Sequence, residues 1–208
     1  MKGRWDWSLG RILHFDAEST GLVRPRQPLP LLLEVAVILT DAELRVLDRY
    51  EAVIHHEKDA LDALDPHPIV VEMHEKSGLW KALREPGTVP VAEAEAAMIG
   101  MLDRHPDPEG RPVVWAGFSP GALDRPLVGA LMPTLYGRLH HRTIDVSALK
   151  LVLKNYAGLQ LEESDALHRA MADAQEELDV LRTFRSYLGQ GLGVEGHDLL
   201  ERAQVGAA

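Results

Sequence analysis

The spacing of hydrophobic residues changes about a quarter of the way along the 208-residue chain. Up to Ile54 the apolar residues gather in short β-prone runs, and turn or loop residues bound each run. We therefore expect the fold to begin with an antiparallel meander. The predicted elements are strands at 11–16, 31–40 and 44–54, a loop over 23–30 with Pro25, Pro28 and Pro30, and a turn at Asp41-Ala42-Glu43.

Beyond Ile54 the apolar residues mostly recur with helical spacing. Residues 61–84 carry this spacing with breaks at Pro66, Pro68 and Gly78. Strands first, and then strands that alternate with helices, predict an α/β fold in which helices flank a mixed sheet. The later elements are predicted as helices at 91–104, 123–135, 147–156 (capped by Ser147) and 167–188, and strands at 111–117 and 142–146.

The composition, with 46% hydrophobic and 26% charged residues, is typical of one globular domain with a sizeable core. We expect this domain at 11–188, after an N-terminal extension over 1–10 and before a glycine-rich tail over 189–208. The chain has no cysteine, which excludes a disulfide scaffold, a thiolate metal site and a cysteine nucleophile. Without a signal peptide or a long apolar run, we expect a cytoplasmic protein with no membrane partner.

The charge balance restricts the partners. The chain carries 32 acidic against 22 basic residues, a formal net charge of −10. Proteins that bind long nucleic acids through phosphate contacts usually present a basic surface. The balance therefore argues against a protein that wraps or slides along a duplex. If the chain handles nucleic acid, metal cations must carry much of the phosphate recognition, and the bound segment is short.

Two carboxylates at the end of the first predicted strand are the first candidate site. Asp16 and Glu18 are two residues apart, so in a strand their side chains share one face. Like charges at this spacing repel unless a cation lies between them. Oxygen ligands of this kind suit Mg²⁺ or Mn²⁺. The alternative is an exposed strand end that carries two solvated acids.

Two further clusters lie near helix starts. Asp124 follows the strand predicted at 111–117, at a strand-to-helix junction where ligands gather in α/β sheets, although it could simply cap the helix. His168 and Asp173 lie near the start of the last helix, where surface positions are the alternative. Five residues apart, they would point roughly 140° apart on a regular helix. They reach one site only if His168 precedes the helix or lies in its first turn.

In this order the residues resemble the pattern of the DnaQ-like (DEDDh) 3′→5′ exonucleases, and within that superfamily the oligoribonuclease family. The resemblance covers about residues 11–188. The matching blocks are Asp16-x-Glu18-x-Thr20-Gly21-Leu22, Glu34-Val35-Ala36 with Thr40-Asp41, Met73-His74-x-x-Ser77-Gly78-Leu79, Asp124-Arg125 with Met132-Pro133, Arg142-x-Ile144-Asp145-Val146-Ser147-x-Leu149-Lys150, and His168-Arg169-Ala170 with Asp173.

The resemblance implies a ribonuclease H-like fold with a five-stranded mixed sheet whose antiparallel part comes first. It also implies that Asp16, Glu18, Asp124 and Asp173 hold two divalent cations, Mg²⁺ or Mn²⁺. His168 would then be the general base, a role that suits an imidazole at neutral pH. The product would be a 5′-mononucleotide.

The resemblance also implies substrate contacts. Leu22 would wedge between the last two bases, and His74 would stack on a base. Three further residues, Ser119, Arg142 and Ser147, fall in or near the blocks at the 5′ end of the substrate, where a partner subunit completes the site in a homodimer. Departures from the family pattern, including Phe118, His141 and Ala172, put strict dinucleotide specificity in doubt and leave the catalytic set intact.

Three functions remain open. The first is a metal-dependent exonuclease for short single-stranded RNA. The second is a related exonuclease of the proofreading or trimming type, which acts on single-stranded DNA or on RNA 3′ ends. The third, a non-catalytic binder of nucleic-acid 3′ ends, would be expected to lack a carboxylate or the histidine, and none is missing.

Overall fold

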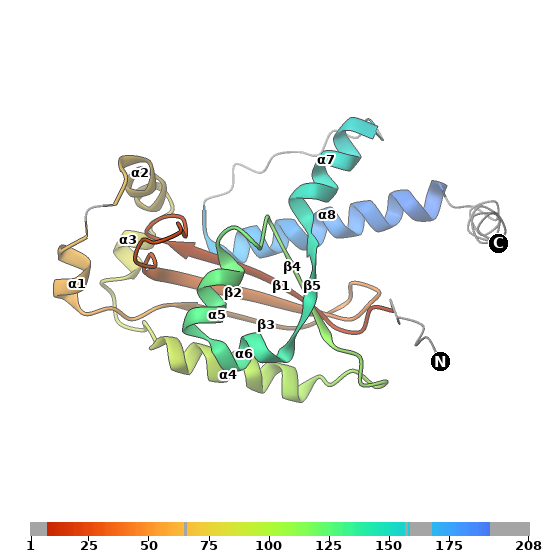
Figure 1. The fold of residues 1–208 in the computed structure, drawn as a ribbon, viewed down its shortest axis with the longest axis horizontal. Coiled ribbons are helices and arrows are strands. Elements are labelled where there is room, and N and C mark those ends of the chain that lie inside the picture. The colour runs from red at the N-terminus through yellow and green to blue at the C-terminus, as the bar shows by residue number, and fades with distance from the viewer. Residues whose placement is uncertain (1–7, 65, 157, 159–167, 192–208) are drawn as a thin grey trace.

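The computed structural model describes residues 8–64, 66–156, 158 and 168–191 (Figure 1). The first seven residues of the predicted N-terminal extension, the predicted helix start at residue 167 and the predicted tail beyond residue 191 lie outside these residues. One mixed sheet of five strands, in the order β3-β2-β1-β4-β5, forms the centre of the fold. β1 pairs antiparallel with β2 and β2 with β3, whereas β4 pairs parallel with β1 and with β5. The strands are β1 (Ile12–Ser19), β2 (Leu32–Thr40), β3 (Val46–Val53), β4 (Val113–Gly117) and β5 (Leu139–Asp145).

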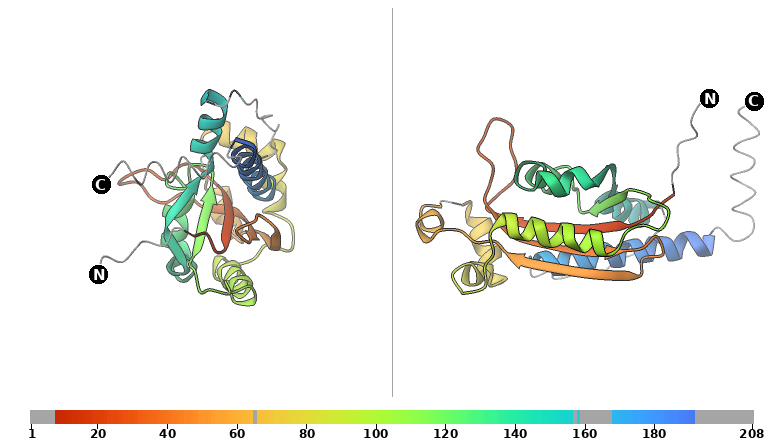
Figure 2. Two further views of the ribbon diagram at one scale, coloured as in Figure 1. Left: turned by 90° about the vertical axis from the view of Figure 1, so that its right-hand side faces the viewer. Right: turned by 90° about the horizontal axis from the view of Figure 1, so that it is seen from below.

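Helices cover both faces of the sheet (Figure 2). One hydrophobic cluster joins the sheet to α4, α5 and α6, and a second joins the opposite face to α8. None of the helices that the structure describes is both long and apolar enough to cross a membrane. The helices are α1 (Lys58–Asp62), α2 (Pro68–Lys76), α3 (Leu79–Ala82), α4 (Val91–Arg104), α5 (Asp124–Leu131), α6 (Pro133–Arg138), α7 (Val146–Tyr156) and α8 (Ala170–Gly191).

The alternation of β1 decides which residues face which layer. Leu13 and Phe15 belong to the cluster under α4 and α5, whereas Ile12 belongs to the cluster under α8. Asp16 and Glu18 follow Ile12 at even spacing, so they share the face that α8 covers. The predicted mixed sheet with its antiparallel part first is therefore confirmed, and its α8 face carries the acids.

Some predicted helix boundaries were wrong. The helix predicted over 123–135 is two helices, because Pro133 lacks an N–H and disfavours helical backbone at Met132, which has φ −132°. Ser147 does not cap α7. That helix begins at Val146, and the carboxylate of Asp145 accepts a hydrogen bond from Ala148 N at 3.1 Å. The last helix begins at Ala170 and continues past Leu188 to Gly191.

Candidate active site

The end of β1 and the start of α8 bring three predicted site residues together. His168 precedes α8, as a site shared with Asp173 requires, and Asp173 lies in the first turn of that helix. Glu18, His168 and Asp173 each offer a ligand atom, and these three atoms lie within 4.8 Å of one another. Carboxylate oxygens with one imidazole nitrogen are donors that a divalent cation accepts. No other such group was found among the described residues.

Asp124 reaches the same region from β4 and the loop that follows it. It is the first residue of α5 and is 4% exposed. The helix N-cap position belongs to Leu123, so the alternative reading of Asp124 as the cap is wrong. Burial and the nearby Glu18 raise the pKa of the Asp124 carboxyl to about 8, although the backbone amides of Asp124 itself and of Ala17 in β1 act to lower it.

The predicted metal ligands repel one another. Burial, and then the charges of Asp124, Asp173, Glu18 and Glu34, raise the pKa of Asp16 well above its usual value. Burial and the charge of Asp173 likewise raise the pKa of Glu18 to about 8, and burial raises that of Asp173 to about 6. Several acids that destabilise each other's charged forms in one place are typical of a cation site. The oxygen-rich donor set therefore fits divalent cations.

One acid of this region escaped the sequence predictions. Glu177 lies one turn after Asp173 on α8 and is fully buried. Its Oε1 accepts a hydrogen bond from Phe118 N at 2.8 Å, and its Oε2 has no hydrogen-bond partner among the described residues. Burial, and then the charge of Asp16, raise the pKa of Glu177 well above its usual value. The i, i+4 spacing from Asp173 was the available signal, since these positions share a helix face.

The structure gives His74 a different position from the predicted one. Its side chain is fully buried, with Nε2 donating a hydrogen bond to the carbonyl oxygen of Ser19 at 3.0 Å and lying 3.9 Å from Glu18 Oε2. Its ring also meets the Trp80 ring edge-on. A base cannot stack on this imidazole as it lies here, because neither of its faces is exposed. Leu22, the predicted wedge, is 65% exposed in the loop after β1.

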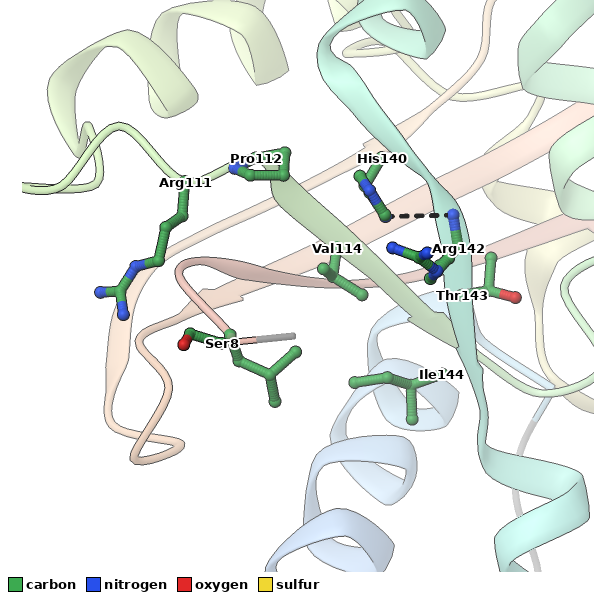
Figure 3. Close-up of a pocket in the computed structure, with 9 residues that line it drawn as sticks. Ser8, Arg111, Pro112, Val114, His140, Arg142, Thr143 and Ile144 are labelled. Carbon is green, nitrogen blue, oxygen red and sulfur yellow. Dashed lines mark hydrogen bonds between the residues drawn. The ribbon is translucent and has the colours of Figure 1, made fainter. Parts of the chain in front are cut away.

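The three residues predicted near the substrate's 5′ end come from the loop after β4, from β5 and from α7. Ser119 Oγ donates to Ser147 Oγ at 3.0 Å, so these two hydroxyls meet. Arg142 lies before the end of β5 and lines a separate cavity of about 210 Å³. Figure 3 shows Arg142 on the wall of this cavity, which Ser8, Val114 and Ile144 also line, and its backbone N–H donates a hydrogen bond to His140 Nδ1.

Comparisons with known proteins agree with this geometry. No family model matches the chain. The chain is 35% identical over 179 residues to an oligoribonuclease of Corynebacterium glutamicum (strain R), covering 84% of the chain and 78% of the relative. It is 37% identical over 180 residues to an oligoribonuclease of Nocardia farcinica, covering 84% and 79%.

Solved structures share the fold at lower identity. Exonuclease I of Methylocaldum szegediense matches with a TM-score of 0.61 and 17% identity, over 85% of this chain and 40% of the other. E. coli exonuclease I in complex with an oligonucleotide gives 0.59 and 18%, over 88% and 42%. The Mg²⁺- and Mn²⁺-bound form of S. pombe Pop2p gives 0.55 and 15%, over 84% and 82%. The chain therefore has the fold of these DnaQ-like exonucleases and belongs to the oligoribonuclease family.

Proposed function

We propose that this protein is a divalent-cation-dependent 3′→5′ exonuclease that hydrolyses short single-stranded oligoribonucleotides to 5′-mononucleotides. The observation that carries the proposal is the meeting of Glu18, His168 and Asp173 within 4.8 Å, beside two more acids that burial and mutual charge hold at raised pKa. Acids distant in sequence gain nothing from this proximity unless a cation joins them. The oligoribonuclease relatives supply the substrate class.

The acids and the imidazole have separate tasks. Asp16, Glu18, Asp124 and Asp173 would hold two cations, Mg²⁺ or Mn²⁺, which when bound supply positive charge to the attacking and leaving oxygens of an in-line displacement at phosphorus. His168 accepts a proton from the attacking water. The 3′-oxygen of the preceding nucleotide leaves, and the terminal nucleotide departs with the phosphate on its 5′ carbon.

The surroundings of the site favour a short, single-stranded substrate. With a formal charge of −10 the chain is poorly suited to follow a long phosphate backbone. Leu22 is exposed and able to wedge against the terminal base. We further propose a homodimer in which the partner subunit closes the 5′ end of the substrate near Ser119, Ser147 and Arg142.

A side-by-side digestion tests the activity. Labelled RNA and DNA oligomers, from dinucleotides to about 20 nucleotides, are incubated with Mg²⁺ or Mn²⁺ and with the wild type, Asp16→Ala or His168→Ala. We expect mononucleotides released from the 3′ end, fastest from the shortest RNA, no release in Asp16→Ala and only a slow residual rate in His168→Ala. Cleavage at the wild-type rate in either variant would contradict the role assigned to that residue.

A second candidate function shares the site. The structural neighbours include E. coli exonuclease I in complex with single-stranded DNA, which favours an exonuclease that acts on DNA 3′ ends. The same digestion separates the two candidates, because faster release from DNA or from the longest oligomers would replace the short-RNA proposal. For the homodimer, sedimentation at micromolar concentration should show a species of twice the 23.0 kDa chain mass, and a monomer alone would refute it.

A further inference from the structure

One ion pair joins β2 to the backbone beside His168. The Glu34 side chain is 3% exposed, and Arg169 Nε lies 3.0 Å from each of its carboxylate oxygens, with Nη2 2.5 Å from Oε1. The backbone N–H of Ala170, the first residue of α8, donates to Oε2 of the same carboxylate at 3.0 Å. A single buried carboxylate therefore fixes both the side chain that follows His168 and the first amide of the helix.

His168 itself has an unusual backbone. Its φ is +45°, a left-handed conformation that a residue with a β-carbon adopts only where its surroundings enforce it. The two residues that follow it are the two that Glu34 holds. Glu34 also lies directly opposite Glu18 in the β1–β2 register, so the carboxylate that holds this turn belongs to the same part of the sheet as a predicted metal ligand.

We propose that the Glu34–Arg169 ion pair is a positioning device for His168. His168 is exposed to solvent. By holding the backbone just after the histidine, the pair keeps the imidazole beside Glu18 and Asp173 and prevents it from turning away from them. Arg169 and Glu34 act through His168 and do not touch the substrate. The inference rests on the base role proposed for His168.

A double-mutant cycle tests this role. Arg169→Gln removes the two-point contact, and we expect it to lower kcat by about 10- to 100-fold, because a misplaced catalytic group loses rate steeply with distance. KM should change by less than about twofold, since substrate contacts stay in place. In a His168→Ala background the same substitution should change kcat by less than about twofold, because the group that it positions is gone. A purely structural loss would be equal in both backgrounds.

Matched variants keep the experiment decisive. Arg182→Gln removes an arginine within α8 whose Nη2 donates to Leu44 O at 3.0 Å, away from the site, and it should leave kcat unchanged. Arg169→Lys retains the charge with a single contact and should recover part of the lost kcat. Thermal unfolding checks folding, and if Arg169→Gln does not fold, Arg169→Lys takes its place in the cycle.

The outcomes separate two failures. Equal losses of kcat in the two backgrounds, or no loss in either, would overturn the positioning role while leaving the exonuclease proposal intact. A His168→Ala protein as active as the wild type would refute the base role, and the positioning role with it. A loss confined to the background that retains His168 supports the proposal.

Discussion

The protonation states of the acids around β1 and α8 determine how strongly these side chains repel one another. In Glu177 the folded protein holds a carboxyl group that is fully buried and whose Oε2 has no hydrogen-bond partner among the described residues. Burial, and then the charges of Asp16, Asp124 and Asp173, oppose its ionisation, so its pKa lies well above the ordinary value of 4.5. This region therefore favours the neutral acid, and a glutamine, whose amide has the same shape, should fit in its place.

We predict that Glu177→Gln stabilises the cation-free protein at pH 8. The folded state retains a proton that the unfolded state loses above about pH 4.5, so the acid's contribution to stability is complete below that pH and falls as the pH rises. The amide keeps an acceptor for Phe118 N and removes this dependence. The gain should be on the order of 1–3 kcal/mol at pH 8 and should vanish near pH 4.5, as measured by chemical denaturation.

Glu176 provides the control for this prediction. It is adjacent on α8, and its Oε1 forms an ion pair with Lys150 Nζ at 2.7 Å. Glu176→Gln should therefore show no gain in unfolding free energy at pH 8. If Glu176→Gln and Glu177→Gln gave the same gain, relief of the general negative charge would explain both, and the local account of Glu177 would be wrong.

His74 allows a supporting role to be separated from a substrate contact. We predict that His74→Phe lowers the free energy of unfolding by about 1–3 kcal/mol, because the Ser19 carbonyl oxygen loses its buried donor. Leu22→Ala should leave stability within about 0.5 kcal/mol and raise KM for the shortest RNA, because Leu22 is exposed. Denaturation curves and kinetics on both variants check this. An unchanged stability in His74→Phe would contradict the supporting role assigned to the buried donor.

At the scale of elements, local patterns were informative where a helix buries one regular face or a strand is a continuous apolar run. The helix predicted over 91–104 is α4 with the same bounds, and the strand predicted over 31–40 is β2 apart from its first residue. The break at Met132 was readable from Pro133 but was outweighed by the continuing apolar spacing. The start of α7 depends on whether the side chain of Asp145 or that of Ser147 accepts a hydrogen bond from a backbone amide in the first turn of the helix. The spacing of hydrophobic residues alone does not decide between the two.

The cap of α7 gives a prediction at this scale. Asp145→Ala should lower the free energy of unfolding by about 1 kcal/mol, because Ala148 N loses the side-chain acceptor that begins the helix. Ser147→Ala should cost less stability, since its hydroxyl meets Ser119 and does not cap the helix. Thermal unfolding of the two variants side by side measures the difference. A larger loss in Ser147→Ala would reinstate Ser147 as the cap.

At the scale of the whole molecule, the resemblance to a family brought more residues of the candidate site together than local spacing did. Glu34 of β2 accepts a hydrogen bond from the start of α8, and Glu177 of α8 accepts one from the loop after β4. These contacts join segments that are more than fifty residues apart in sequence. No local pattern contains such pairings. For the same reason the burial of His74 against Ser19 was missed, because it depends on how α2 lies over the end of β1.

The acids of the site should make the stability of the whole protein depend jointly on pH and cations. Asp124 and Glu18 have pKa values of about 8 in the folded protein and Asp173 of about 6, all above their ordinary values. The folded state thus binds more protons than the unfolded state between about pH 4 and pH 8. Without cations the contribution of these acids to the free energy of unfolding should therefore be greatest near pH 4 and should fall toward pH 8.

Divalent cations should reverse this loss. At pH 8 they replace the protons that the carboxylates would otherwise need, and at a concentration of 100 times the dissociation constant they stabilise the folded state by about 2.7 kcal/mol. At pH 5 the protons compete for the same oxygens, so the gain should be smaller. Thermal unfolding with a chelator or with Mn²⁺ at both pH values measures it, with Asp16→Asn as the control that should lose most of the gain at pH 8. An equal shift at both pH values, or a full shift in Asp16→Asn, would mean that the cations bind elsewhere, because only ions held by these acids exchange for their protons.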